Sequence, residues 1–181
     1  MRKRGATREL ALISLLGALI VACAFISIPF LSIPVTMQLF GIYFALFTLG
    51  GRAGSASVVL YVAIGVLGLP VFSGFSGGIG RLFDATGGFI IGFILLALSY
   101  WLFSAVLPKT RGGRICSAVI GSLVLYLVGA LWYAVVYLGG VVHFTSAVLY
   151  TVLPFVIFDA VKLILALICS DLLKKQLHIT N

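Results

Sequence analysis

LALISLLGALIVACAFISI, from Leu10 to Ile28, is a run of 19 residues that contains no charged side chain. As an α-helix, this run is about 30 Å long, which is the thickness of the hydrocarbon core of a bilayer. The whole chain has 181 residues, of which 62% are hydrophobic and 9% are charged. A water-soluble domain of this length needs far more polar side chains to cover its surface. The sequence therefore predicts an all-α integral membrane protein.

Further apolar runs predict six transmembrane helices in a single transmembrane domain over residues 1–181. The approximate spans are 10–28, 35–49, 53–69, 89–107, 115–138 and 154–173, with a tight turn at Gly50-Gly51-Arg52 and a loop at 139–146. The start of the last span has two interpretations. Pro154 either kinks a helix that begins near Ala147 or occupies the first turn, where its missing N–H costs nothing. We favour the first-turn position, because residues 154–173 alone are long enough to span.

The N-terminus resembles a cleavable signal peptide. Basic residues from Arg2 to Arg8 precede an apolar run, and Ile20-Val21-Ala22-Cys23 resembles a lipoprotein cleavage box. However, the apolar run continues past Cys23 and at least four more spans follow. We therefore expect a retained first transmembrane helix.

The net charge of +8 is distributed as in a membrane protein. Ten of the twelve basic residues lie in four short clusters between apolar runs or at a terminus: Arg2, Lys3, Arg4 and Arg8; Arg52; Lys109, Arg111 and Arg114; Lys174 and Lys175. With six spans, these clusters and both termini face the cytoplasm, in agreement with the positive-inside rule. Arg81 is then the one cation on the outer face, and Lys162 lies inside the membrane. This distribution excludes a nucleic-acid-binding surface.

The cysteines and histidines do not predict a metal site or a disulfide framework. Cys23, Cys116 and Cys169 are widely spaced, and His143 and His178 are isolated. We expect both histidines to be solvated, one in a loop and one in the C-terminal tail.

Two of the charged residues lie inside the last predicted span. Asp159 and Lys162 are three residues apart and so share one helix face. An unpaired charge at the bilayer centre costs at least about 2.5 kcal/mol, so the two groups are expected to pair. The pair is either a structural salt bridge or a ligand-binding group. We favour the ligand-binding role, because a buried ion pair stabilises a fold poorly compared with apolar packing. Glu9 and Asp171, in contrast, lie beside cytoplasmic cations and are explained by charge pairing.

A glycine-rich stretch separates the third and fourth spans. It contains seven glycines between Gly68 and Gly88, but no Gly-Lys-Ser/Thr follows, so it is not a phosphate-binding P-loop. It is either a flexible connection or a loop that folds over a ligand. The interleaved Phe72, Phe75 and Phe83, together with Arg81, favour a loop that covers an amphipathic anionic solute.

A stripe of small residues runs along the first span, where Ser14, Ala18 and Ala22 recur every four residues beside Gly17. Small residues at this spacing allow a second helix to approach closely. Both internal packing and the binding of a partner helix explain the stripe.

Several blocks of sequence, taken in order and spacing, resemble the biotin-specific membrane subunit, or S component, of energy-coupling-factor vitamin transporters. The resemblance runs from about Ala18 to Leu173, and its blocks are Ile26–Pro29, Pro34–Gln38, Gly68–Phe72, Gly77–Gly80, Thr86–Phe93 and Pro154–Lys162. The chain departs from the family pattern at Asp84-Ala85, where the family often has a proline before the Thr-Gly-Gly.

The resemblance implies a six-helix S-component fold in the cell membrane that binds biotin at its outer side. It also implies three partners, namely a transmembrane coupling subunit and two ATP-binding-cassette ATPases. No catalytic residue or cofactor of its own is expected. The Asp-x-x-Lys pair of the family lies in the vitamin pocket, which carries over to Asp159 and Lys162. The small-residue stripe faces the coupling subunit, which carries over to Ala18 and Ala22, with Ser14 on the same stripe.

The chemistry of biotin agrees with these residues. Asp159 can accept a hydrogen bond from a ureido N–H, and Lys162 can donate one to the ureido carbonyl. Further candidate contacts are Gln38 and Thr36 for hydrogen bonds, Phe72 and Phe75 with Tyr43 or Trp132 for the apolar parts, and Arg81 for the carboxylate.

Three other interpretations are weaker. The chain could be an S component for another vitamin or a stand-alone proton-coupled carrier with Asp159 as the proton site. An intramembrane enzyme is disfavoured, because the spans contain no His/Glu metal motif and no Ser/His pair.

Overall fold

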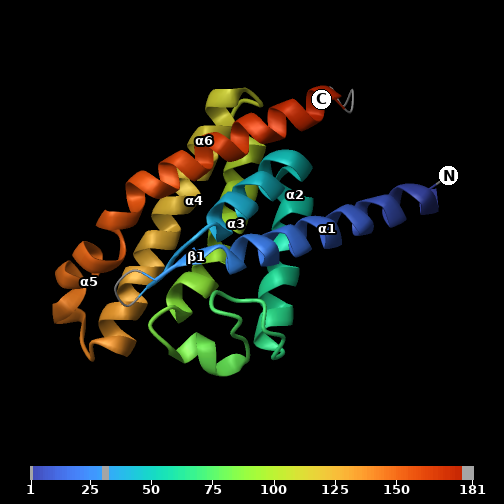
Figure 1. The fold of residues 1–181 in the computed structure, drawn as a ribbon. Helices are drawn as coiled ribbons and strands as arrows, with labels where there is room; N and C mark the ends of the chain where they lie inside the picture. Colours follow the sequence, from blue (N-terminus) through green and yellow to red (C-terminus); the bar gives the residue numbers. More distant parts are fainter. Residues whose placement is uncertain (1, 30–32, 177–181) are drawn as a thin grey trace.

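The computed structural model describes residues 2–29 and 33–176, and the side chains from Gly5 onward. Within these residues the chain folds into six α-helices: α1 (Arg2–Phe25), α2 (Gln38–Val66), α3 (Gly87–Val106), α4 (Arg111–Trp132), α5 (Phe144–Thr151) and α6 (Leu153–Gln176) (Figure 1). The remaining elements are short: strands β1 (Ser27–Ile28) and β2 (Val35–Thr36), 3₁₀ helices η1 (Ile79–Phe83) and η3 (Val141–His143), and the π-helical turn η2 (Tyr133–Tyr137). The prediction of an all-helical membrane protein is confirmed, apart from the small ribbon.

Helix α2 contains two of the predicted spans. Its backbone leaves the helical conformation at Gly50, where φ is +82° and ψ is 177°. The second half folds back against the first, and a Cβ on Gly54 would lie 2.7 Å from the Cα of Leu46. Only glycine permits so close an approach at this position. The two halves therefore correspond to the predicted spans 35–49 and 53–69, joined by the predicted turn.

Five helices of the described chain are long and apolar enough to cross a membrane: α1, α2, α3, α4 continued by η2, and α6. With the two halves of α2 counted separately, these are the six predicted helices. Their outward faces carry many exposed apolar side chains, including Leu102, Leu123 and Ile157. Exposed apolar surface of this extent is typical of a protein that faces lipid.

The first span ends earlier than predicted. Helix α1 stops at Phe25 instead of Ile28, because Ser27 pairs with Thr36 and Ile28 pairs with Val35 in an antiparallel ribbon. The ribbon brings the start of α2 back beside the end of α1. As a result, Thr36 and Gln38 enter the interior of the bundle.

The predicted loop at 139–146 is shorter in the structure. Gly139 and Gly140 form a bend, whereas residues 141–146 enter η3 and the start of α5. Helix α5 packs against both α4 and α6. The chain leaves the helical hydrogen-bond pattern at Val152, and α6 then begins at Leu153. Pro154 therefore lies in the first turn of α6, as favoured from the sequence. His143 ends η3, and His178 lies outside the described residues.

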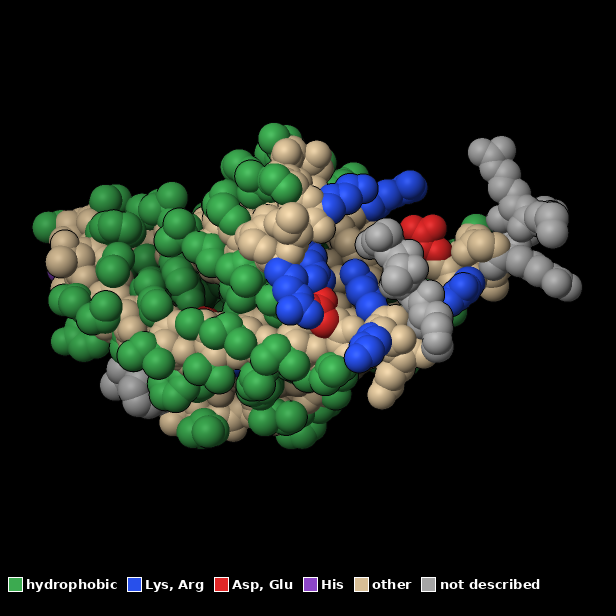
Figure 2. Space-filling model, turned by 90° about the horizontal axis from the view of Figure 1, so that it is seen from above, with side chains coloured by type: hydrophobic (Ala, Val, Ile, Leu, Met, Phe, Trp, Pro, Cys, Tyr) green, Lys and Arg blue, Asp and Glu red, His purple; other side chains and the backbone are tan. Residues whose placement is uncertain are grey.

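The start of α1 and the end of α6 lie at the same end of the bundle (Figure 1). Figure 2 looks onto this end and shows Lys and Arg side chains gathered there, with apolar side chains over the rest of the view. Asp171 of α6 pairs here with Arg111 and Arg114 of α4, at 2.8 Å and 2.7 Å. The prediction that Asp171 is explained by charge pairing is confirmed.

Candidate ligand-binding site

A cavity lies between the helices, and its lining includes Arg81 of η1 and Thr151 of α5. Its empty space, including its mouth, is about 690 Å³. The lining residues come from the ribbon, α2, the glycine-rich stretch, α3, α4, α5 and α6. The polar ones are Thr36, Gln38, Ser73, Arg81, Thr86, Tyr126, Thr151, Asp159 and Lys162. A mostly apolar cavity with a few polar groups is typical of a small-molecule site.

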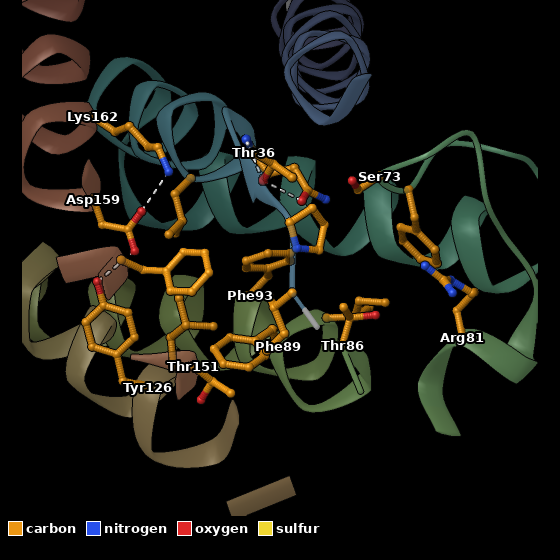
Figure 3. A pocket seen from close by; sticks show the side chains of 18 residues that line it. Thr36, Ser73, Arg81, Thr86, Phe89, Phe93, Tyr126, Thr151, Asp159 and Lys162 are labelled. Carbon is orange, nitrogen blue, oxygen red and sulfur yellow. Dashed lines mark hydrogen bonds and ion pairs between the residues drawn. The ribbon is translucent and has the colours of Figure 1, made fainter. Parts of the chain in front are cut away.

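The inner end of the cavity holds a buried ion pair. Asp159 and Lys162 lie on one face of α6, only 5% and 6% exposed, with 2.8 Å between Oδ1 and Nζ. The hydroxyl of Tyr126 donates to the other carboxylate oxygen of Asp159, also at 2.8 Å. Both oxygens of Asp159 are thus fixed in position, while Lys162 uses one of its three donors on Asp159. Figure 3 shows the three side chains together at one end of the cavity.

A second polar group comes from the ribbon and the start of α2. The hydroxyl of Thr36 donates to Oε1 of Gln38 at 2.8 Å. The side-chain nitrogen Nε2 of Gln38 donates to the hydroxyl of Tyr61. These bonds hold the Gln38 amide in one orientation. The structure therefore brings Thr36 and Gln38 to the same cavity as Asp159 and Lys162.

Arg81 lies at the opposite end of the cavity from the ion pair (Figure 3). Its side chain is 33% exposed and pairs with the carboxylate of Asp84, the residue at which the chain departs from the family pattern. Asp84 also accepts a hydrogen bond from the backbone N–H of Ala85 at 2.6 Å. The Nε of Arg81 is buried and has no hydrogen-bond partner among the described residues. A donor is therefore left over at this end of the cavity.

Aromatic side chains form the wall between the two polar ends. Phe72 is buried and packs edge-on against Tyr61, with 5.6 Å between the ring centroids. Phe89 and Phe93 of α3 also line the cavity and lie between the ion pair and Arg81 (Figure 3). The cavity is thus polar at both ends and apolar in the middle.

Three predicted contacts lie outside the cavity. Phe75 is 68% exposed and stacks on Phe25 at the end of α1, with 4.3 Å between the ring centroids. Tyr43 is buried on the other side of Asp159, with its hydroxyl 2.7 Å from Ser122 Oγ. Trp132 donates from Nε1 to the backbone carbonyl of Asp84 at 3.2 Å and so supports the loop rather than the cavity wall.

The sequence did not single out Tyr126, Phe89, Phe93, Ser73, Thr86 or Thr151. Phe89, Phe93 and Thr86 fall in a block that carried the family resemblance. Tyr126 could have been found only by a general rule, namely that a tyrosine within an apolar span needs a hydrogen-bond partner for its hydroxyl.

The small-residue stripe on α1 faces outward. Ser14, Ala18 and Ala22 are exposed, whereas the neighbouring Gly17 packs 3.6 Å from Leu60 and the backbone of Ser57, measured from an added Cβ. Internal packing within this chain is therefore the wrong explanation of the stripe.

A membrane-embedded helical bundle with a mostly apolar cavity that is polar at both ends defines a membrane protein that binds a small solute. Comparison with a crystal structure identifies the fold. The S component for biotin from an ECF-type ABC transporter matches with a TM-score of 0.80, over 97% of this chain and 95% of that one, at 24% sequence identity. The S component of a bacterial ECF transporter matches with a TM-score of 0.56 at 19% identity. These likenesses show that the chain has the S-component fold.

The chain belongs to the BioY family, whose sequence model matches residues 1–179. The probable biotin transporter BioY of Pyrococcus horikoshii is 36% identical over 92% of this chain and 96% of its own length. The biotin transporter BioY of Thermotoga maritima is 37% identical over 93% and 96% of the two chains. The chain is accordingly a transport subunit and a multi-pass protein of the cell membrane.

Proposed function

We propose that this chain binds biotin and takes it up as the substrate-specific subunit of an energy-coupling-factor transporter. Relatives named as biotin transporters match it over nearly their full length, which supports this substrate. The single observation that carries the proposal is the buried Asp159–Lys162 pair, held by Tyr126 at the inner end of the cavity.

The ureido ring of biotin fits the inner end chemically. Lys162 keeps two donors free of Asp159, and one of them can reach the ureido carbonyl oxygen. Each carboxylate oxygen of Asp159 can accept a further hydrogen bond, which suits a ureido N–H. The thiophane ring and the valeryl chain then extend past Phe72, Phe89 and Phe93, away from the polar end.

The biotin carboxylate would reach the end of the cavity that carries Arg81. The buried Nε of Arg81 supports this assignment, because an unsatisfied buried donor is costly until it meets an acceptor. Asp84 already neutralises part of the guanidinium charge and holds its orientation. The biotin carboxylate would therefore bind a guanidinium group whose charge is partly neutralised and whose orientation is already fixed by Asp84.

The Arg81 assignment predicts a loss of discrimination between biotin and its uncharged amide. A charge-assisted hydrogen bond contributes roughly 1.5–3 kcal/mol when shielded from water, so the wild-type chain should prefer the acid by about tenfold or more. Arg81→Ala should lose most of that preference, and Lys109→Ala, which removes an exposed cation elsewhere, should keep it. Competition binding with the two ligands measures the ratio. If Arg81→Ala keeps the wild-type ratio of the two affinities, Lys162 and not Arg81 contacts the carboxylate.

Gly65→Ala is expected to weaken biotin binding by changing the cavity wall. The added Cβ would lie 2.2 Å from Cζ of Phe72, and both residues are buried. The ring must move, and overpacking of this kind costs about 1–3 kcal/mol, so affinity should fall about tenfold. Gly80→Ala in η1 is the control, because nothing lies within 4 Å of its added Cβ. If both variants bind biotin with the wild-type affinity, Phe72 does not contact the ligand.

The partners follow from the outward face of α1. The exposed Ser14, Ala18 and Ala22 offer a surface on which a helix of a transmembrane coupling subunit can pack closely. Two ATP-binding-cassette ATPases on the cytoplasmic side would supply the energy, so the chain itself needs no catalytic residue and no cofactor. Both termini would face the cytoplasm, as the positive-inside rule requires.

Uptake by a biotin auxotroph tests the proposed function. Cells that express the chain with the coupling subunit and ATPases should grow on trace biotin, and cells with the ATPase module alone should not. Uptake of another labelled vitamin by the same cells, without uptake of biotin, would assign the chain to that vitamin. Uptake that survives inactivated ATPases would favour the stand-alone carrier.

A further inference from the structure

Helices α4 and α6 form a second surface feature, which shares Asp159 and Tyr126 with the wall of the ligand cavity. An apolar hollow between them is lined by residues such as Val119, Leu123, Val156 and Leu163, with α5 closing one end. Its empty space, including its open side, is about 950 Å³. Because most of the lining belongs to two membrane-spanning helices, this hollow lies at the depth of the lipid chains.

A smaller hollow lies on the same two helices near their charged end. It is lined by Arg111 of α4 and by Leu167, Ile168, Asp171, Leu172 and Lys175 of α6. Leu163 of the apolar hollow and Leu167 of the charged one are four residues apart, so the two hollows follow each other along one face of α6. Together they form what we term the α4/α6 groove, apolar along its length and charged at one end.

The charged end of the groove carries an excess of positive charge. Asp171 is shared between Arg111 and Arg114, so one carboxylate faces two guanidinium groups. Lys174 and Lys175 follow on the next turn of α6. Arg111 engages Asp171 through Nε, and its side chain is 75% exposed, which leaves its terminal nitrogens accessible. The exposed side of Arg111 and Lys175 can therefore receive an anion despite the neighbouring Asp171.

We propose that the α4/α6 groove binds an anionic phospholipid, with the phosphate between Arg111 and Lys175 and one acyl chain along the apolar hollow. Basic pockets between membrane helices near the surface bind anionic headgroups, and each nearby Lys or Arg strengthens the attraction. The charged end of the groove suits the phosphate headgroup, and the apolar hollow that follows it suits an acyl chain. Asp159 and Tyr126 line the cavity and the apolar hollow alike, so the acyl chain would keep water from the outer side of the buried ion pair.

Native mass spectrometry of the purified chain in detergent tests the lipid site. The probes are phosphatidylglycerol, phosphatidylcholine with the same acyl chains, and glycerol phosphate as a headgroup without chains. The wild-type chain should retain phosphatidylglycerol in preference to the other two. Arg111→Ala/Lys175→Ala should bind phosphatidylglycerol about tenfold more weakly. Arg52→Ala/Lys109→Ala removes the same charge from exposed positions outside the groove and should leave the binding unchanged.

Two further variants separate the site from general effects. Val119→Trp fills the apolar hollow and should weaken binding of both lipids. Arg111→Lys/Lys175→Arg preserves the charge and should keep the preference for phosphatidylglycerol. This variant tests the proposal if Arg111→Ala/Lys175→Ala fails to fold. Equal retention of both lipids by the wild type would overturn the proposal. So would equal losses in the two charge-removing pairs, or binding of glycerol phosphate as tight as that of the lipid.

Discussion

Asp159→Asn is expected to weaken biotin binding by about thirtyfold or more. The variant keeps the shape of the side chain but leaves Lys162, which is buried beside it, as an uncompensated cation. Truncating one partner of a buried charged pair costs roughly 2–5 kcal/mol. In addition, the acceptor for the ureido N–H loses its charge. Binding of radiolabelled biotin to the purified variant measures the loss.

Matched variants separate a ligand contact from a structural salt bridge. Asp171→Asn makes the same chemical change in the ion pairs at the charged end of the bundle and should leave biotin affinity unchanged. Tyr126→Phe removes a hydrogen bond to Asp159 without removing charge, and we expect an intermediate loss. Nearly unchanged binding in both Asp159→Asn and Lys162→Ala would leave the pair with a structural role only.

Ala18→Trp is expected to abolish uptake while biotin binding persists. Ala18 lies on the exposed stripe of α1, and a large ring there prevents the close approach of a partner helix. The ligand cavity contains no residue of α1, so binding should not change. Vitamin uptake in cells and co-purification of the ATPases measure the effect on assembly, and Ala22→Trp should behave in the same way.

Leu12→Trp is the control for the helix itself. Leu12 is also exposed on α1, but it projects about 120° around the helix from Ala18. This variant should retain uptake. Loss of uptake in both variants would point to a general defect of α1 in the membrane, and loss of biotin binding in Ala18→Trp would show that the stripe supports the fold.

The sequence predicted the parts of the fold that depend on hydropathy and on local backbone chemistry. Apolar runs of membrane length located the helices, and Gly50-Gly51 located the turn within α2. The spacing of Asp159 and Lys162 predicted their pairing, because three residues place both groups on one helix face. Each of these inferences needs only neighbours in the sequence.

The features that were missed depend on contacts between distant segments. The β1–β2 ribbon shortens the first helix through pairing across the intervening chain, which hydropathy does not register. Helix α5 follows two glycines that indicated a loop, and its packing on α4 and α6 overrides that local signal. Within a span, lipid-facing and cavity-facing positions are both apolar, so hydropathy did not distinguish the cavity-lining Phe89 and Phe93 from residues that face lipid.

The central claim is that the cavity between Asp159 and Arg81 is a biotin site. Equilibrium binding of radiolabelled biotin to the purified chain, without coupling subunit or ATPases, tests it most directly. The account predicts saturable binding of one biotin per chain that excess thiamine or riboflavin does not displace. Displacement by another vitamin, or no saturable binding of biotin by a folded chain, would contradict it.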